Sequence, residues 1–424
     1  MNIEQLHGLF LTCRNANTDT RKITKDAMFF ALKGDAFNGN TFASKAIEAG
    51  AKYAVVDEAE YAISTQYILV NDVLKTLQEL ASFHRQYLKL PILALTGSNG
   101  KTTTKELINA VLSRHFNTVA TIGNLNNHIG VPLTLLSMDS TTEFGIVEMG
   151  ANHLKEIEFL SNIVKPDYGY ITNFGKAHLE GFGSVEGIIK GKSELYEFLI
   201  KNNKTIFVNA SDPTQLEKTK EANRICFGNS SATDIEVHMH SCDPFVKVQY
   251  QDRIIQSNLI GAYNFNNIAV AIAVGHYFKV SVDTIETAIV SYIPTNNRSQ
   301  ILAIDSNKII LDAYNANPTS MEAAIRNLHG LSDNNKILVL GDMFELGHEA
   351  AKEHQNIVNL IESLGFRNVY LLGQNFHETK SLFNTFKSFE DFKTGFKKSD
   401  FEQSTILIKG SRGMALERVV ELLK

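Results

Sequence analysis

The chain has no tryptophan, three cysteines and seven prolines among its 424 residues. Cys13, Cys226 and Cys242 are odd in number and lack the spacing of metal ligands, so we interpret them as reduced, structural thiols. The scarcity of proline predicts short linkers. These absences exclude a disulfide scaffold and a proline-rich, disordered chain.

Long apolar runs and an excess of one charge are also missing. No stretch approaches the roughly 20 apolar residues of a membrane helix, and the N-terminus has no basic region ahead of an apolar one. The formal net charge of −5 gives no general attraction to nucleic acid or anionic lipid. We therefore expect a cytoplasmic protein that binds neither nucleic acid nor membranes, and whose loops hold any negatively charged ligand.

The length and the order of strand-like and helix-like segments predict an α/β protein of three domains. Residues 1–85 predict a small α/β domain. Residues 86–295 predict a mostly parallel sheet with helices on both faces, which binds ligands at the carboxyl ends of its strands. Residues 296–424 predict a second doubly wound, Rossmann-like domain. The expected central elements are strands 91–96, 144–149, 168–172 and 204–209, and helices 101–115, 184–200 and 264–278.

A glycine loop joins the expected strand 91–96 to the expected helix 101–115. It reads Gly97-Ser98-Asn99-Gly100-Lys101-Thr102-Thr103. Backbone N–H groups around Gly97, Ser98 and Gly100 can point at phosphate oxygens, while Lys101 reaches the β- and γ-phosphates and the Thr102 hydroxyl binds Mg²⁺. The standard P-loop has a further glycine where this chain has Leu95. The sequence thus predicts a P-loop-like ATP site of shorter spacing.

This loop resembles the nucleotide loop of the Mur ligase family, whose ATP-dependent enzymes add amino acids to the peptidoglycan precursor. The resemblance covers nearly the whole chain. It implies that the cofactors are ATP and two Mg²⁺ ions. It also implies that amide-bond formation passes through an acyl phosphate intermediate. We expect the protein to act as a monomer.

Three side chains are candidate metal ligands besides Thr102. Glu148 ends the strand 144–149, where its carboxylate would face the same crevice as the glycine loop; a solvated strand-end charge is the alternative. The run Ala-His178-Leu-Glu resembles the family segment whose histidine binds a second metal ion, which makes His178 a ligand. In the family, the lysine that matches Lys192 is carbamylated, whereas an arbitrary helix would simply expose Lys190 and Lys192.

Two stretches resemble the parts of the family that contact the adenosine of ATP. Gly261-Ala-Tyr263-Asn264-Phe-Asn-Asn267 is similar to Gly-x-His-Asn-x-x-Asn, with Tyr263 in place of the histidine, and its asparagines would contact adenine. Asn264 can equally be a helix N-cap.

The second stretch lies at the start of the last domain. Arg298 matches a family arginine at the hinge, and Asp312 and Tyr314 match an Asp-x-Tyr-x-x-Asn-Pro pattern. The resemblance implies that Asp312 accepts hydrogen bonds from the ribose and that Tyr314 stacks on the base. A plain strand followed by an Asn-Pro turn explains the same residues without it.

The N-terminal residues resemble the uridine-nucleotide domain of the family. Asp19-Thr20-Arg21 occupies the place of the family's usual Asp-Ser-Arg. Lys33 is followed by Asn38-Gly39-Asn40, where the family usually has Asp-Gly-His. We expect Thr20 and Lys33 to bind the uridine-diphosphate substrate.

Residues 123–136, 312–321 and 340–347 resemble the branch of the family that joins D-alanyl-D-alanine to UDP-N-acetylmuramoyl-tripeptide. The resemblance implies these two molecules as substrates, with Asn126 and Asn127 as further binding residues. Another Mur-type ligase, which adds a diamino acid to the dipeptide precursor or glutamate to folate, is an alternative, although the Asp-Asn-Pro-Arg stretch of the diamino-acid branch is missing. A regulatory ATP-binding module is the alternative from another class.

Overall fold

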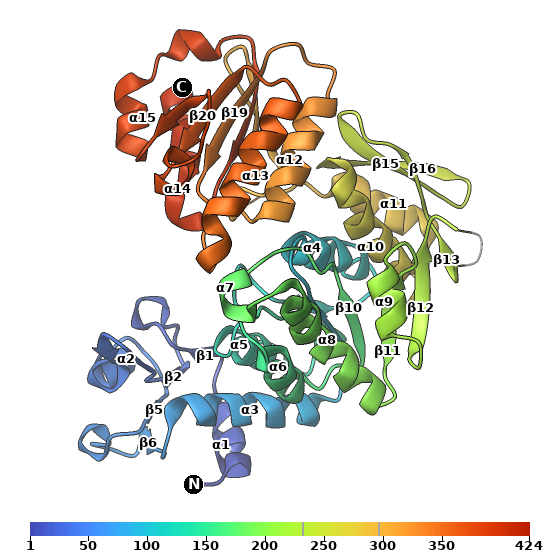
Figure 1. The fold of residues 1–424 in the computed structure, drawn as a ribbon. Coiled ribbons are helices and arrows are strands. Elements are labelled where there is room, and N and C mark those ends of the chain that lie inside the picture. Colours follow the sequence, from blue (N-terminus) through green and yellow to red (C-terminus); the bar gives the residue numbers. More distant parts are fainter. Residues whose placement is uncertain (231–232, 296) are drawn as a thin grey trace.

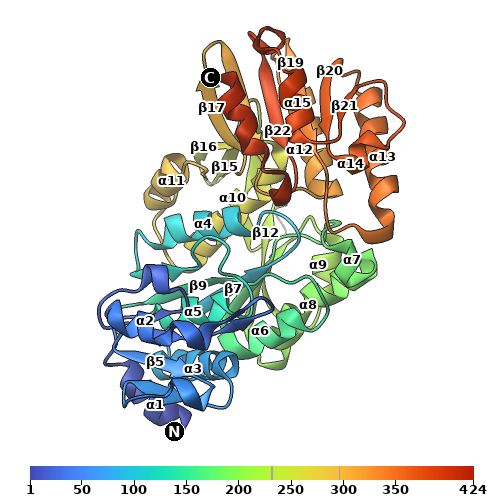
Figure 2. The same ribbon diagram turned by 90° about the vertical axis from the view of Figure 1, so that its left-hand side faces the viewer.

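The computed structural model of the chain describes residues 1–230, 233–295 and 297–424 and folds them into three α/β units (Figure 1). The predicted fold class is confirmed. The N-terminal and C-terminal units lie on opposite sides of the central one (Figures 1 and 2). The limits of the three domains stay predictions, and the limit placed at residue 296 falls outside the described residues.

The N-terminal unit holds a four-stranded parallel sheet in the order β1-β2-β5-β6. Its last helix, α3, packs Leu77 and Leu80 into the core that it shares with the central unit. The elements are α1 (Ile3–Phe10), β1 (Ala16–Asn17), β2 (Met28–Phe30), β3 (Lys33–Gly34), β4 (Phe37–Asn38), α2 (Ala43–Glu48), β5 (Tyr53–Val56), β6 (Tyr67–Leu69) and α3 (Val73–Leu88).

The central unit is built on a seven-stranded parallel sheet in the order β13-β12-β11-β10-β7-β9-β8. Its elements are β7 (Ile92–Thr96), α4 (Lys101–Leu112), β8 (Thr118–Ala120), α5 (Gly130–Leu136), β9 (Phe144–Glu148), α6 (Glu156–Val164), β10 (Tyr168–Ile171), α7 (Leu179–Phe182), α8 (Val185–Lys201), β11 (Thr205–Asn209), α9 (Pro213–Lys218), β12 (Asn223–Gly228) and β13 (Ile235–Glu236).

Strand β7 lies inside this sheet and is buried throughout, and its residues 92–95 are apolar because helices cover both of its faces. Ile92 and Ala94 pack on the side of α5, α6 and α8, whereas Leu93 and Leu95 pack on the side of α4 and α10 (Phe265–Tyr277). The phosphate loop therefore starts from a strand that is fixed on every side.

A small antiparallel sheet follows, in the order β14 (His238–Ser241), β15 (Phe245–Tyr250) and β16 (Arg253–Ile260), and α10 and α11 (Val282–Ser291) come after it. This sheet is missing from the predicted elements. The alternation of buried Val246, Val248 and Tyr250 with more exposed residues is nevertheless typical of a half-buried strand.

The C-terminal unit holds a six-stranded sheet in the order β17-β18-β22-β19-β20-β21, which is parallel except for the edge strand β17. Its elements are β17 (Gln300–Ile304), β18 (Asn307–Asp312), α12 (Pro318–Gly330), β19 (Lys336–Gly341), α13 (Ala350–Ser363), β20 (Asn368–Leu372), α14 (Gln374–His377), β21 (Asn384–Phe386), α15 (Phe389–Gly395), β22 (Thr405–Lys409) and α16 (Val419–Leu423). Among the described residues, no helix is both long and apolar enough to cross a membrane.

Candidate active site

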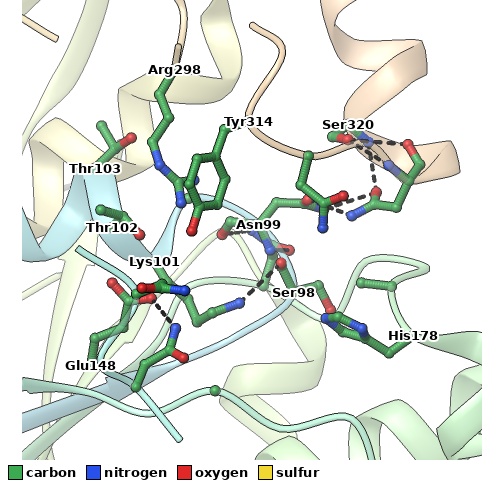
Figure 3. Close-up of a pocket in the computed structure, with 18 of the residues that line it drawn as sticks. Ser98, Asn99, Lys101, Thr102, Thr103, Glu148, His178, Arg298, Tyr314 and Ser320 are labelled. Carbon is green, nitrogen blue, oxygen red and sulfur yellow. Dashed lines mark hydrogen bonds between the residues drawn. The ribbon is translucent and has the colours of Figure 1, made fainter. Parts of the chain in front are cut away.

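A cavity of about 620 Å³ opens between the central and C-terminal units. In Figure 3 the phosphate loop lies near its centre, with Arg298 and Tyr314 toward one side and His178 toward the other. The structure thus collects most of the predicted site residues, which are Ser98, Asn99, Gly100, Lys101, Thr102, Thr103, Asn126, Asn127, Glu148, His178, Asn264, Asn267, Arg298, Asp312 and Tyr314.

Glycine is required at two positions of the phosphate loop, residues 97–103. Gly97 has a φ of +137°, and a Cβ there would lie 2.0 Å from Thr172 Oγ1. Gly100 has a φ of +79° and precedes α4, and its Cβ would approach Asn267 Oδ1 to 2.7 Å. Both positions combine a left-handed backbone with a close neighbour, which only glycine tolerates without displacement. Gly97 does not line the cavity but sets the course of the loop.

Asn173, which follows β10, fastens the loop. It accepts hydrogen bonds from Ser98 N–H (3.0 Å) and Asn99 N–H (3.2 Å), and its amide donates to Asn99 O (2.9 Å). The Ser98 N–H is therefore engaged by the protein rather than pointing at a phosphate as expected from the sequence. The N–H groups of the first turn of α4 have no intrahelical acceptor and remain suited to that role. The buried Ser98 Oγ also has no hydrogen-bond partner among the described residues.

Lys101 folds its side chain back over the loop. Its ammonium donates hydrogen bonds to Gly97 O at 2.7 Å and to Ser98 O at 3.3 Å. Burial lowers the pKa of Lys101, the nearby Glu148 carboxylate works against this effect, and the Arg298 charge adds to it. A phosphate in the loop would supply the opposite charge that favours a buried ammonium. The contact with the β- and γ-phosphates stays a prediction.

Glu148 and Thr102 fit a divalent cation. Glu148 is 1% exposed at the end of β9; its Oε1 accepts a hydrogen bond from Asn126 Nδ2 at 2.8 Å, while its buried Oε2 has no hydrogen-bond partner among the described residues. Thr102 is buried at the start of α4 and lines the same cavity. Carboxylate and hydroxyl oxygens suit Mg²⁺.

Protein side chains alone would not complete such a site. The described residues contain no group of three His, Cys, Asp or Glu side chains that could hold a metal ion. Mg²⁺ at nucleotide sites is commonly bound by one or two protein oxygens together with phosphates and waters. The donor set at Glu148 and Thr102 therefore corresponds to a cation that arrives with a nucleotide.

Asn264 and Asn267 connect the cavity to the phosphate-loop helix. Asn267 Oδ1 accepts a hydrogen bond from Thr104 Oγ1 at 2.9 Å, and Asn267 Nδ2 donates to Asn264 Oδ1 at 2.8 Å. Asn264 Nδ2 in turn donates to Ile260 O at 2.8 Å, and its side chain does not cap α10. Asn264 is thus the N-cap residue of α10 by position, but its side chain makes no capping hydrogen bond, and the adenine contacts stay a prediction.

Arg298 and Tyr314 stack on each other, with the guanidinium 3.6 Å from the ring centroid. Nearby, Asp312 Oδ2 accepts a hydrogen bond from Lys409 Nζ at 2.6 Å, and Asp312 Oδ1 accepts one from Ser299 N–H at 3.0 Å. Lys409 lines the cavity but is absent from the predicted site. Lys409 ends β22 and pairs with Asp312 across the parallel strands, a register that appears only in the fold.

His178 contacts the side-chain carboxylate of Glu345, a residue of the C-terminal unit that is absent from the predicted site. Its Nδ1 lies 2.5 Å from Glu345 Oε2, and Glu180 N–H donates a hydrogen bond to Glu345 O at 3.2 Å. The hydrogen bond from His178 lowers the pKa of Glu345. Glu345 belongs to the stretch 340–347, whose resemblance to one branch of the family is the only sequence signal for it. The metal-binding role of His178 stays a prediction.

Two further contacts tie the C-terminal unit to the phosphate-loop region. Lys176 Nζ lies 2.7 Å from Glu353 Oε1, and Asn317 Nδ2 donates a hydrogen bond to Asn99 Oδ1 at 2.7 Å. The phosphate loop and the segment that carries Lys176 are thus both tied to the C-terminal unit by polar contacts.

Lys192 is fully buried in α8 and does not itself line the cavity. Its Nζ donates a hydrogen bond to Ala151 O at 2.9 Å, and Ala151 does line the cavity. Burial, followed by the charge of Lys101, holds the pKa of Lys192 well below its usual range. The neutral amine that this favours is the form that reacts with CO₂. An unmodified amine offers no oxygen ligand, so the metal-binding role requires the carbamate and stays a prediction.

The four predicted substrate-binding residues are divided between two places. Asn126 faces Glu148 in the cavity, whereas Asn127 Oδ1 accepts hydrogen bonds from Ile129 N–H and Gly130 N–H at the start of α5. Thr20 and Lys33 lie in the N-terminal unit, outside this cavity. Lys33 Nζ lies 2.9 Å from a carboxylate oxygen of Asp57 and 2.8 Å from one of Glu58. Substrate contacts of all four residues stay predictions.

Comparisons with known proteins agree with this arrangement. The profiles of the Mur ligase family catalytic domain, the Mur ligase middle domain and the Mur ligase glutamate ligase domain match residues 13–88, 95–275 and 297–412. The UDP-N-acetylmuramoyl-tripeptide--D-alanyl-D-alanine ligase of Bacillus subtilis is 34% identical over 95% of this chain and 92% of that protein.

Two solved structures are similar over almost the whole chain. MurF from Acinetobacter baumannii has a TM-score of 0.85 at 27% identity and covers 100% of this chain and 98% of its own. MurF ligase from Thermotoga maritima in complex with ADP has a TM-score of 0.83 at 25% identity and covers 98% and 97%. Together with the match of family profiles to each of the three units, these likenesses show that the chain belongs to the Mur ligase family of amide-forming ligases.

Proposed function

We propose that this protein joins D-alanyl-D-alanine to UDP-N-acetylmuramoyl-tripeptide in the cytoplasm, using ATP and releasing ADP and phosphate. The observation that carries the proposal is the cavity, in which the phosphate loop of the central unit faces Arg298, Asp312 and Tyr314 of the C-terminal part. Relatives that are named for this activity match nearly the whole chain.

The reaction proceeds in two steps. A carboxylate oxygen of the tripeptide attacks the γ-phosphorus of ATP, the bond to the β–γ bridging oxygen breaks, and ADP leaves. The neutral amine nitrogen of the dipeptide then attacks the acyl carbon, the carbon–oxygen bond to phosphate breaks, and the proton lost by the nitrogen passes to the departing phosphate. The N–H groups at the start of α4 and the Lys101 ammonium bind the transferred phosphoryl group, so that positioning and charge neutralisation lower the barrier.

Thr102 and Glu148 would hold Mg²⁺, which neutralises phosphate charge when bound. A second ion would be held by His178 and by Lys192 as a carbamate. Asp312 and Tyr314 would contact the ribose and the base, and Thr20 and Lys33 the uridine nucleotide. We infer that the protein acts as a monomer.

The dependence of ADP release on both substrates tests this function. ADP should form rapidly only when UDP-N-acetylmuramoyl-tripeptide and D-alanyl-D-alanine are both present, because the acyl phosphate needs a carboxylate donor and its turnover needs an amine. A regulatory ATP-binding module would release ADP at the same slow rate with neither substrate, with either one alone and with both. That result would refute the proposed ligase activity.

His178→Ala should raise the Mg²⁺ concentration needed for half-maximal turnover by about tenfold or more, because removing one ligand leaves a hard cation poorly held. A magnesium titration of ADP release at saturating substrates measures the effect. His153→Ala, which removes an exposed histidine at the start of α6, serves as the matched control. An unchanged titration for His178→Ala would show that His178 has only a structural role.

A further inference from the structure

The stretch 340–347 brings a carboxylate into the cavity from the C-terminal unit. Strand β19 ends at Gly341, and Phe344 and Glu345 just beyond it both line the cavity. Glu345 has a φ of +60°, and its carbonyl oxygen accepts a hydrogen bond from the backbone of Glu180 in the central unit. Its backbone is therefore fixed across the two units, while its side chain remains 49% exposed.

The carboxylates that line the cavity differ in how their charges are engaged. Glu148 is buried and hydrogen-bonded to Asn126, and Asp312 is held by Lys409 and by a backbone N–H. Glu156 accepts hydrogen bonds from the backbone N–H groups of Asn152 and His153. Glu345 accepts none from a backbone N–H among the described residues, and His178 is its one charged partner there. Its exposed carboxylate is thus the one best able to bind a cation entering the cavity.

The position of this carboxylate along the cavity indicates which cation it would meet. Figure 3 shows Ser98 and Asn99 between the Arg298–Tyr314 pair and His178. The nucleotide base and ribose are assigned to the Arg298 and Tyr314 side, so the γ-phosphate end of the loop faces His178 and its neighbour Glu345. The amine that attacks the acyl group must arrive at that end, and a free α-amine is largely protonated at neutral pH.

We propose that Glu345 binds the amino group of the incoming dipeptide and holds it beside the acyl phosphate. This inference rests on the proposed function and adds the residue that recognises the acceptor substrate. A charge-assisted hydrogen bond from an ammonium to a carboxylate gives both affinity and orientation. The bound ammonium gives one proton to solvent before its nitrogen attacks the acyl carbon. Because Glu345 lies on the C-terminal unit, the acceptor is positioned against the phosphate loop of the central unit by a residue from the other unit.

The variant Glu345→Gln tests the proposal because it keeps the size of the side chain and removes its charge. We expect its KM for D-alanyl-D-alanine to rise about ten- to a hundredfold, with the KM values for ATP and for the UDP-precursor changed less than about threefold. Glu345→Asp, which keeps the charge on a shorter side chain, should have an intermediate KM. Melting temperatures establish that the variants are folded.

Hydroxylamine separates acceptor binding from the first half of the reaction. It is largely neutral at pH 8 and traps acyl phosphates as hydroxamates, so it does not need a carboxylate to bind an ammonium. With ATP and UDP-N-acetylmuramoyl-tripeptide, Glu345→Gln should form the hydroxamate at nearly the wild-type rate. Glu353→Gln is the matched control, because it removes the interdomain contact with Lys176 outside the cavity lining and should leave the KM for the dipeptide unchanged.

Three outcomes would overturn the proposal. An unchanged dipeptide KM in folded Glu345→Gln would show that the carboxylate does not bind the acceptor. An equal loss of hydroxamate formation, or a Mg²⁺ requirement raised as in His178→Ala, would show that Glu345 instead orients His178. An equal rise in dipeptide KM for Glu353→Gln would show that domain docking causes the effect. The absence of hydroxamate from the wild-type protein would contradict the proposed function itself.

Discussion

Lys101→Ala is expected to lower the rate of ADP release at saturating substrates by about a thousandfold while the protein stays folded. The ammonium is the cation of the phosphate loop, and removing one preorganised charge from a transition state that gains charge typically costs about a hundred- to a thousandfold. Its hydrogen bonds in the structure are to Gly97 O and Ser98 O of its own loop. Leu107 and Val111 still anchor α4 in the core, so the melting temperature should change by only a few degrees.

Arg114→Ala provides the control for Lys101→Ala. Arg114 is exposed beyond the far end of α4, where its loss removes the same charge without reaching the cavity. Its ADP release should match that of the wild type. Near-normal turnover in Lys101→Ala would remove the phosphate loop from the proposed mechanism.

Lys192→Ala should be close to inactive, with turnover reduced about a hundredfold or more, and acetate should restore part of it. A carbamate supplies an anionic oxygen, so a small carboxylate that enters the vacated space can replace it where an amine cannot. The fully buried Lys192 side chain leaves room for such a molecule when it is removed. ADP release is measured against acetate and against ethylamine.

The neighbouring lysine supplies the matched control for this rescue. Lys190 is exposed on the same helix, and Lys190→Ala should retain full activity that acetate does not change. Rescue of Lys192→Ala by ethylamine and not by acetate would mean that Lys192 acts as a cation, which would contradict the carbamate.

The fold could largely be predicted because its strands and helices differ in pattern. The buried strand Ile92–Thr96 and the amphipathic helix Lys101–Leu112 lie where the sequence places them, since both faces of a parallel sheet are covered and one face of α4 is buried. The sheet β14-β15-β16 is missing from the prediction. Strands β15 and β16 alternate buried with more exposed side chains, whereas the rest of the chain is dominated by helix and parallel-strand patterns, so this different signal is easily overlooked.

The site could be predicted where its residues are neighbours in the chain, as in the phosphate loop. Lys409 and Glu345 could not be predicted in this way. The position of Lys409 depends on which strand lies beside β18, and that of Glu345 depends on how the C-terminal unit docks onto residues 176–180. The burial of Lys192 but not Lys190 is a tertiary effect too. Residues two apart on a helix do not share a face, and only the fold decides which of them points inward.

The choice of acceptor tests the central claim most directly. D-alanyl-D-alanine brings one amine and one carboxylate, whereas a diamino acid brings a second charged amine, for which this chain lacks the Asp-Asn-Pro-Arg stretch. Burying charges without partners costs several kcal/mol, which corresponds to a discrimination on the order of a thousandfold. Phosphate release should be measured with UDP-N-acetylmuramoyl-tripeptide plus D-alanyl-D-alanine and, separately, with the dipeptide precursor plus lysine or diaminopimelate. We predict rapid turnover of the first mixture and almost none of the second; faster turnover of the second would contradict the proposed activity.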